Sequence, residues 1–511
     1  MQTTQKLQQN REQRLFQIAL LVILAFGILL RASKYLRGWS LRGDELAVTL
    51  NLINRSALDL MTKPLDYEQA APFGFLLVMK ALISLFGHSD YVLRLTAFAA
   101  GCISLLLAHT LFRKVLTKYG HVFALIAFAS GNYLIFYSAE LKQYSTDVLF
   151  ALLLLLAFHQ HLSREARPRD FSLLAALGVL ALCFSYPALF VLIGIGVTLL
   201  LHYWKDRQKR LWMFLIGILW AGTFLVIYWA LLRHQTEDPF LITFWDNLLS
   251  FMPMPPWSEI SWFYKAAEGF FFVVAGFSTP LLLILPIYIL GLWGVLRERN
   301  WQWAVALTLP IALNVIVSGF QKYPFHGRLI LYLVPLVLIV LGKGIDHLIH
   351  FIRNQAFARA AFAGLLILFF SSVITTTNSY LFTHSYVRED LKSVFSFMEM
   401  NHQDDDFVYL YHFVGPEYLY YAPEYHLEDL PYFMGKNHSA RAKRYQDEIS
   451  ALPRGQRVWF VFSFVIQTRV RKGEKEDERE YMLNYLKENG TLLKEFYATN
   501  NVSSAHLFIL E

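Results

Sequence analysis

The chain has 511 residues, of which 56% are apolar and only 17% are charged. This balance is too apolar for a water-soluble domain of the same size and indicates a membrane protein. The formal net charge of +7 does not indicate a nucleic-acid partner, because the basic residues lie mostly in short loops between apolar runs and form no basic stripe on a polar face.

Eleven apolar segments are candidates for transmembrane helices. A helix needs about 20 residues to cross a hydrocarbon layer about 30 Å thick, and it pairs its own backbone groups there. Pro187 favours a break between the fifth and sixth segments, since proline lacks an N–H donor. We therefore expect a polytopic α-helical membrane protein with about eleven transmembrane helices, over residues 15–33, 92–112, 119–138, 145–162, 170–185, 187–204, 211–232, 269–296, 301–319, 328–345 and 359–382.

Basic residues occur in alternate loops between these segments. Arg11 and Arg14 precede the first segment, and five later loops are basic, whereas the loops between them carry far fewer basic residues. Since cytoplasmic loops are enriched in lysine and arginine, we expect a cytoplasmic N-terminus and a non-cytoplasmic C-terminal region, with a bacterial inner or plasma membrane as the setting. The five loops contain Arg113, Lys114 and Lys118; Arg164, Arg167 and Arg169; Lys205, Arg207, Lys209 and Arg210; Arg297 and Arg299; and Lys343, Arg353 and Arg359.

The first predicted outer loop covers residues 34–91 and contains the run Arg42-Gly43-Asp44-Glu45. An apolar piece follows from Pro72, with Lys80 in its middle. It has about 15 residues, which is short for a span, so we expect an interfacial helix with Lys80 on its polar edge. A span here would also invert the alternation of the basic loops.

The C-terminal region, residues 384–511, has a different composition and is rich in charged residues. Apolar residues recur at helical spacing from Leu391 to Met398, which predicts an amphipathic helix. Residues 407–411 and 458–462 have the β-branched and aromatic content of buried strands. We expect a small soluble α/β domain on the outer face, attached to a transmembrane module that occupies residues 1–383.

Three groups of acidic and basic residues fall on the predicted outer side, although the topology was derived without them. A sugar carried on a polyprenyl phosphate already has a good leaving group, so cations that stabilise the departing phosphate and one carboxylate that takes the proton of the nucleophile suffice for its transfer. The groups are Asp44 and Glu45; Glu140, Lys142, Tyr144 and Asp147; and Lys322, Tyr323, His326 and Arg328.

Several short motifs together resemble the GT-C membrane glycosyltransferases. They are Gly43-Asp44-Glu45, Ala71-Pro72 followed by Phe86-Gly87 and Leu93-Arg94-Leu95, the run from Tyr137 to Tyr144, and Tyr323-Pro324 followed by Arg328 and an apolar helix. The order of the motifs and their shared side make the likeness specific, and it covers roughly residues 10–350. The chain is most similar to the bacterial branch of protein mannosyltransferases and lipid A aminoarabinose transferases.

The resemblance implies roles for individual residues. Asp44, with Glu45 beside it, corresponds to the acid of the first outer loop that serves as base or binds acceptor, and Glu140 corresponds to a second acid. Lysine replaces the usual arginine at Lys142, which offers a point charge in place of a bidentate fork. Residues expected to hold donor phosphate are Lys142, Lys322, Tyr323, His326 and Arg328, and Lys80 and Tyr144 are further candidates.

Structural interpretations compete with these roles. Asp44 could instead be an ordinary loop acid that faces solvent. Glu45 could instead be a structural partner of Arg42 or Arg37. Glu140 has the alternative of an ion pair with Lys142. Lys80 could instead be an anchor whose side chain extends to the membrane interface. Arg328 could instead cap the start of the tenth span. His326 fits either interpretation, and Tyr144 and Tyr323 fit an interfacial aromatic belt.

The sequence thus predicts an inverting glycosyltransferase that moves a sugar from a polyprenyl-phosphate donor to a lipid, glycan or protein acceptor. Membrane lipid is the other expected partner, and nucleic acid is not one. Some relatives use a divalent metal ion near the first acidic loop, but no ligand spacing here specifies a metal site. The main alternative is a multi-span transporter or flippase of lipid-linked glycans, which would line its spans with ionisable residues. A glycan polymerase or ligase and a non-catalytic scaffold are the others.

Overall fold

The computed structural model describes residues 2–383, 390–438, 441–465, 467–471, 474–498 and 501–511. The chain forms two compact units. The first, here called the helical unit, contains Met1–Arg37 and Arg55–Thr383. The second, here called the sheet unit, contains Gly38–Asn54 and His384–Glu511, so it takes one piece of chain from each side of the helical unit.

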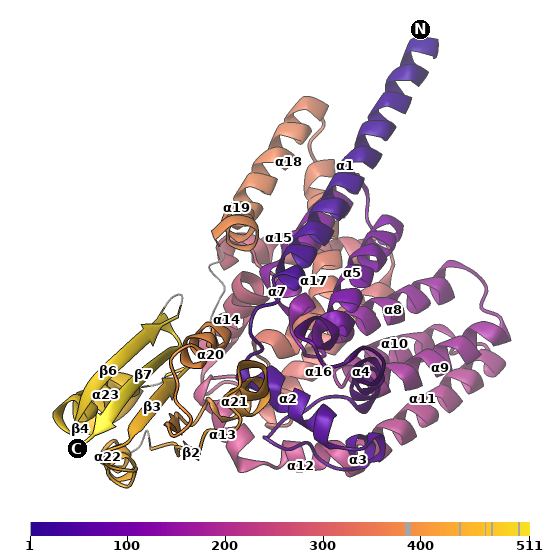
Figure 1. The fold of residues 1–511 in the computed structure, drawn as a ribbon. Helices are drawn as coiled ribbons and strands as arrows, with labels where there is room; N and C mark the ends of the chain where they lie inside the picture. The colour runs from indigo at the N-terminus through magenta and orange to yellow at the C-terminus, as the bar shows by residue number, and fades with distance from the viewer. Residues whose placement is uncertain (1, 384–389, 439–440, 466, 472–473, 499–500) are drawn as a thin grey trace. The chain divides into compact units, whose positions relative to one another are not determined.

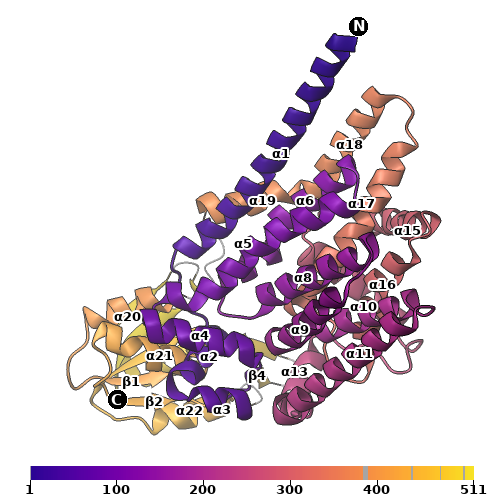
Figure 2. The same ribbon diagram turned by 90° about the vertical axis from the view of Figure 1, so that its right-hand side faces the viewer.

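The helical unit is built from helices alone in the residues described (Figures 1 and 2). In chain order they are α1 (Gln2–Leu36), α3 (Ala57–Thr62), α4 (Phe73–Phe86), α5 (Asp90–Val115), α6 (Lys118–Ser130), α7 (Asn132–Phe136), η1 (Tyr137–Ala139), α8 (Tyr144–Ser163), α9 (Pro168–Phe184), α10 (Ala188–His202), α11 (Arg207–Ile227), η2 (Tyr228–Leu232), α12 (Arg233–Thr236), α13 (Pro239–Asn247), α14 (Ile260–Glu268), η3 (Gly269–Val274), α15 (Leu281–Arg297), α16 (Trp301–Gly319), η4 (Gly327–Leu333), α17 (Val334–His350), α18 (Gln355–Phe370), α19 (Ser372–Asn378) and η5 (Ser379–Thr383).

The predicted multi-span architecture is confirmed, with shorter helices than expected in places. Among the described residues, six helices are long and apolar enough to cross a membrane, and eight segments are if each of two bent pairs counts as one span. Three further predicted spans are helices of 15 to 17 residues: α9, α10 and α15. The predicted break at Pro187 lies between α9 and α10.

The expectation of one continuous span over residues 269–296 is wrong. η3 ends at Val274, and α15 begins only after Pro280. Gly276 between them has φ +77°, a left-handed conformation that glycine adopts without a steric penalty. The apolar run is therefore interrupted by a turn before α15 begins, which composition alone does not reveal.

Two contacts connect α17 with the predicted basic loops that follow α5 and α15. The backbone N–H of Thr117 donates to a carboxylate oxygen of Asp346 at 2.7 Å, which joins the loop after α5 to the end of α17. Lys343 pairs with Glu298 at 2.7 Å and joins α17 to the loop after α15. These three basic segments are therefore neighbours in the fold, and which end of the helical unit faces the cytoplasm stays a prediction.

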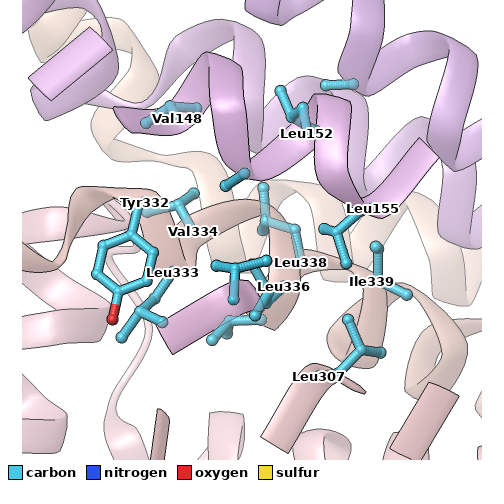
Figure 3. Close-up of a cluster of buried hydrophobic side chains, with 14 of the residues drawn as sticks. Val148, Leu152, Leu155, Leu307, Tyr332, Leu333, Val334, Leu336, Leu338 and Ile339 are labelled. Atoms are coloured by element: carbon cyan, nitrogen blue, oxygen red, sulfur yellow. The ribbon is translucent and has the colours of Figure 1, made fainter. Parts of the chain in front are cut away.

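The interior of the helical unit is closely packed around α17. Figure 3 shows side chains of α8 and α16 against this segment, with Leu152, Leu155 and Leu307 facing Ile339 and its neighbours. Between membrane helices close approach depends on small residues, since lipid tails are as apolar as the side chains. At the crossing of α15 and α17, a Cβ added to Gly291 would lie 1.9 Å from the carbonyl oxygen of Val340.

The sheet unit contains a five-stranded mixed sheet in the order β2-β1-β3-β7-β6. β1 pairs in parallel with β2 and β3, and β7 pairs antiparallel with β3 and β6. Its elements are α2 (Gly43–Asn54), α20 (Leu391–Glu399), β1 (Phe407–Leu410), α21 (Gly415–Tyr421), η6 (Ala422–Tyr425), β2 (Tyr432–Met434), α22 (Lys443–Ser450), β3 (Arg457–Phe462), β4 (Gln467–Arg471), β5 (Glu474–Asp477), α23 (Glu478–Glu488), β6 (Gly490–Tyr497) and β7 (Ser504–Leu510). β4 and β5 form a separate two-stranded sheet.

The two predicted strands and the predicted amphipathic helix of this region are confirmed. The four apolar residues at helical spacing in α20 are all buried, and β3 is buried from Val458 to Phe462. Successive strand residues point to opposite faces. Accordingly, the ring of Trp459 lies 6.1 Å from that of Phe397 in α20, whereas the ring of Phe460 lies 5.3 Å from that of Tyr409.

Candidate active site

The acidic run of the first outer loop forms the start of α2, inside the sheet unit. The backbone N–H of Arg42 donates to the Glu45 carboxylate at 3.0 Å, and the N–H of Glu45 donates to the carbonyl of Arg42 at 2.8 Å. This is half of a capping box, in which the third residue of a helix satisfies the backbone donor of the residue before it. Glu45 is fully buried and caps the helix, while Asp44 is partly exposed in the first turn. Of the two acids, only Asp44 is partly exposed.

The chain just before Asp44 is held by α20 and α21 of the same unit. The backbone N–H of Leu41 donates to the hydroxyl of Tyr421 at 2.8 Å, and a Cβ added to Gly43 would lie 3.0 Å from a carboxylate oxygen of Glu417. Leu41 and Tyr421 are both buried. These partners lie about three-quarters of the chain away in sequence, and no local pattern could have identified them.

Glu140 forms a buried ion pair with Lys34, from the last turn of α1. Lys34 also donates to the carbonyl of Phe136 at 3.0 Å and lies 3.7 Å from the centre of that ring. The sequence had offered Lys142 as the partner of Glu140, and Lys34 was not among the predicted site residues. The signal that could have found it is a lysine that ends an otherwise apolar membrane helix.

Lys142 and Gln143 tie this acidic turn to the loop before α4. The ammonium of Lys142 donates to Oε1 of Gln69 at 2.7 Å, and the amide of Gln143 donates to the carbonyl of Ala70 at 3.3 Å. Both side chains are buried. The turn that carries Glu140 is therefore rigidly placed, as a binding site requires.

The cationic loop before α17 approaches the same turn. The guanidinium of Arg328 lies 5.5 Å from the ring centre of Tyr144, a cation–π contact that joins η4 to the first residue of α8. The ring of Tyr144 in turn packs edge-on against that of Tyr137, with centres 5.0 Å apart. Lys322 donates to the carbonyl of Thr236 at 3.3 Å, at the same end of the unit. Sequence regions nearly 200 residues apart thus meet beside Glu140.

Tyr323 and His326 have properties that narrow their predicted roles. The hydroxyl of Tyr323 donates to the carbonyl of Leu329 at 3.0 Å. Burial raises the pKa of this phenol and nearby Asp147 raises it further, so Tyr323 stays protonated and its one proton is already shared. Partial desolvation by the surrounding residues and the charge of Arg328 lower the pKa of His326, so the neutral imidazole prevails at pH 7. His326 can therefore offer a hydrogen bond to phosphate, whereas the charge comes from Arg328.

Asp147 is a buried carboxylate one turn into α8, only 3% exposed. It lies near Ser185 and Tyr323. The sequence placed Asp147 in the acidic turn but did not single it out among the site residues, because an acid in the first turn of a helix is common. Its burial is what marks it, since an acid without a compensating cation is expensive inside a membrane helix.

Lys80 lies in the middle of α4, half-buried. The helix has 14 residues, about 21 Å in length, which is too short to span the hydrocarbon. Its expected position along the membrane interface stays a prediction. As for a metal, no group of three or more histidine, cysteine, aspartate or glutamate side chains in the described part of the chain could hold an ion. We assign no residue to that role.

The arrangement at this end of the helical unit suits recognition of a phosphate group. Lys142 and Arg328 bring positive charge to a buried turn, and Tyr144 and Tyr137 provide an aromatic surface beside it. In such partly buried surroundings, hydrogen bonds from cations to phosphate are stronger than in water. The acids are Glu140, neutralised by Lys34, and Asp147.

Residues 70–229 match the family described as dolichyl-phosphate-mannose-protein mannosyltransferase. No curated protein matches the sequence. The fold is similar to that of ArnT from Cupriavidus metallidurans bound to undecaprenyl phosphate, with 13% identity over 96% of this chain and 97% of that chain and a TM-score of 0.50. The apo state of the same ArnT gives 13% identity, 98% coverage of both chains and a TM-score of 0.49. The fold is also similar to that of the Archaeoglobus fulgidus oligosaccharyltransferase in complex with Zn and sulfate. The identity is 12%, the match covers 81% of this chain and 62% of that chain, and the TM-score is 0.48.

Proposed function

We propose that this chain, whose residues 70–229 match a membrane mannosyltransferase family, transfers one sugar from a polyprenyl-phosphate donor to an acceptor with inversion at the anomeric carbon. The family acts on a lipid-linked phosphate sugar, and the multi-span fold suits a donor of that kind. The acceptor class is a lipid, glycan or protein with a hydroxyl or amine nucleophile.

The gathering of cations around the Glu140 turn carries the proposal. Arg328 reaches this turn from the loop before α17, and Lys142 is fixed within it. A transporter would also bind a lipid-linked glycan, but it would not require a general base. The enzyme requires both, and Asp44 is the partly exposed acid that supplies the base in this proposal.

The transfer step follows from the chemistry of the donor. The acceptor oxygen or nitrogen attacks the anomeric carbon from the face opposite the phosphate, and the bond from that carbon to the phosphate oxygen breaks. The polyprenyl phosphate leaves with the electron pair, and Arg328 and Lys142 stabilise its negative charge. Asp44 takes the proton from the nucleophile, and Glu140, held by Lys34, keeps the turn in place. Attack from the opposite face inverts the configuration.

Replacement of Arg328 tests the proposal directly. Arg328→Ala should weaken binding of a polyprenyl-phosphate sugar about 10- to 100-fold, since a charge-assisted hydrogen bond contributes roughly 1.5–3 kcal/mol. A matched control is Arg297→Ala, because the Arg297 guanidinium also lies over an aromatic ring, that of Trp293 at 4.9 Å, but at the basic-loop end of the unit. Unchanged donor binding in Arg328→Ala, or the absence of donor binding by the unaltered protein, would contradict the proposal.

A further inference from the structure

The segment that carries Asp44 is part of the sheet unit, although its neighbours on both sides in sequence belong to the helical unit. Three contacts hold it just ahead of Asp44. Tyr421 accepts the N–H of Leu41 at 2.8 Å, Ser40 accepts the N–H of Lys392 at 3.4 Å, and Gly43 lies close to Glu417.

Tyr421 is itself fixed on several sides. It is fully buried, its ring lies 6.4 Å from that of Phe395 in α20, and the ammonium of Lys392 lies 5.3 Å from its ring centre. Its hydroxyl oxygen therefore offers a well-defined acceptor for the backbone of Leu41. Gly43 explains the close approach, because a side chain there would press against the Glu417 carboxylate.

We propose that Tyr421 is a positioning residue for Asp44, so that the C-terminal part of the chain sets the geometry of the catalytic base. This inference rests on the proposed function, in which Asp44 takes the proton of the acceptor. A displacement of about 1 Å in a catalytic group can cost about 100-fold in rate, so one hydrogen bond near Asp44 has a measurable effect.

The test compares two buried tyrosines of the same helix. Tyr421→Phe leaves the N–H of Leu41 without its acceptor, and kcat should fall about 10-fold while KM for the donor stays unchanged. Tyr418→Phe is the matched control, because Tyr418 is equally buried and its hydroxyl donates to the carbonyl of Leu427 at 2.6 Å, away from α2. It should lower stability without that fall in kcat.

Asp44→Asn, measured alongside, separates this inference from the proposed function. Loss of transfer in Asp44→Asn and a lower kcat in Tyr421→Phe alone support the positioning role. An inactive Asp44→Asn with normal turnover in Tyr421→Phe, or equal losses of kcat in both tyrosine variants, overturns it. Full activity in Asp44→Asn removes the catalytic assignment of Asp44, and the positioning role with it.

A second inference comes from a cavity at the basic-loop end of the helical unit. The cavity has a volume of 480 Å³ and lies between the ends of α5 and α8, which run side by side (Figure 2). Lys114, His159 and Arg164 line it, together with the apolar side chains of Leu153 and Leu156. The lining residues from Leu153 to Arg164 lie about 14–30 Å from Tyr144 along the axis of α8, so the cavity is separate from the turn that carries Glu140.

The two permanently charged side chains that line the cavity differ in their ion pairing. Arg164 pairs with Asp170 at 2.8 Å, whereas Lys114 has no ion-pair partner among the residues that the structure describes. His159 shares a hydrogen bond of 3.0 Å with Ser163. A cationic rim over an apolar wall, at the end of two membrane helices, fits a phosphate group attached to a hydrocarbon chain.

We propose that this cavity binds a lipid-borne phosphate with Lys114 as its principal contact, independently of the transfer site. Native mass spectrometry of the detergent-solubilised protein tests it with added phosphatidylglycerol, phosphatidylcholine or a polyprenyl phosphate. Lys114→Gln should weaken binding of the anionic lipid about fivefold. Lys118→Gln is the control, since Lys118 lies against the Phe16 ring and does not line the cavity.

The experiment shows whether the bound phosphate belongs to phosphatidylglycerol or to the polyprenyl phosphate. Binding of either anionic lipid supports the inference. Equal binding of phosphatidylcholine, an unchanged affinity in Lys114→Gln, or displacement of the lipid by inorganic phosphate at low millimolar concentration overturns it.

Discussion

At the scale of single residues, the two neighbouring acids Asp44 and Glu45 have different surroundings. Glu45 is buried and accepts the N–H of Arg42, whereas Asp44 is partly exposed in the first turn of α2. Adjacent residues of a helix point in different directions, so one can cap while the other faces a substrate. Glu45 therefore has a structural role, and the proposed catalytic role falls to Asp44 alone.

This division predicts distinct effects of replacement. Asp44→Asn should lower kcat about 100- to 10,000-fold, the usual contribution of a general base, without loss of stability. Glu45→Gln keeps an acceptor for the Arg42 N–H and should retain most activity, whereas Glu45→Ala should lower the free energy of unfolding by about 0.5–2 kcal/mol. Turnover with a synthetic donor and thermal unfolding in detergent measure both. A large loss of kcat in Glu45→Gln would contradict the assignment.

The sequence could predict the side of the membrane on which a residue lies, but not its interaction partner. The acidic turn and the cationic loop could be placed on one side from hydropathy, because that signal is local. The partner of Glu140 could not, because Lys34 lies 106 residues earlier and the sequence also offers Lys142, two residues away. Only the fold decides between a neighbour in sequence and a neighbour in space.

At the scale of elements, the helical unit depends on glycines where α15 crosses α17. A Cβ at Gly291 would meet the Val340 carbonyl at 1.9 Å, and one at Gly344 would meet the Ile287 carbonyl at 2.1 Å. Both obstacles are backbone atoms, which cannot move without the helix. The crossing is therefore set by residues whose only property is their small size.

Gly291→Ala should consequently destabilise the helical unit by about 1–3 kcal/mol, the usual cost of overpacking. Gly217→Ala in α11 is the control, because a Cβ there has nothing within 4 Å and alanine is the better helix former. Thermal unfolding of the purified protein measures both variants. Equal midpoints for Gly291→Ala and the unaltered protein would show that the helices separate without cost.

Elements of the sheet unit were predictable to different degrees. β1, β3 and α20 follow from strand composition and helical spacing, which are properties of short stretches. The membership of α2 in this unit does not, because it depends on contacts such as that from Leu41 to Tyr421, 380 residues apart. An apolar run interrupted by Gly276 likewise appears continuous to any hydropathy average.

At the scale of the whole molecule, the loops of the helical unit form two predicted sets, basic loops and loops with few basic residues, that alternate along the chain. The positive-inside rule assigns the set with Lys343 and Arg299 to the cytoplasm and the set with Lys322 to the other side. A membrane-impermeant thiol reagent added to intact cells should therefore label Lys322→Cys and not Arg299→Cys, in a background with Cys102 and Cys183 replaced by serine. The reverse pattern would place the proposed transfer site in the cytoplasm.

The sheet unit contains histidines whose protonation opposes folding. Burial lowers the pKa of His506 in β7 to about 3, and burial together with His438 lowers that of His412 to about 4. Glu478 acts in the opposite sense, because burial raises the pKa of its carboxyl and the folded state then takes up a proton more readily. The net response to acid depends on which groups titrate in a given pH range.

Between pH 6.5 and about pH 4.5 the histidines dominate, since the unfolded chain binds protons that the folded unit excludes. The free energy of unfolding should therefore fall as the pH is lowered through 6.5, by at most about 1.4 kcal/mol per pH unit for each histidine. His506→Gln should reduce this slope, because His506 is only 1% exposed and glutamine does not titrate. Urea unfolding at each pH, read by pulsed hydrogen exchange of β3 and β7 at one fixed labelling pH, measures the slope for this unit alone. An identical slope in His506→Gln would show that His506 is not protonated on unfolding in this range.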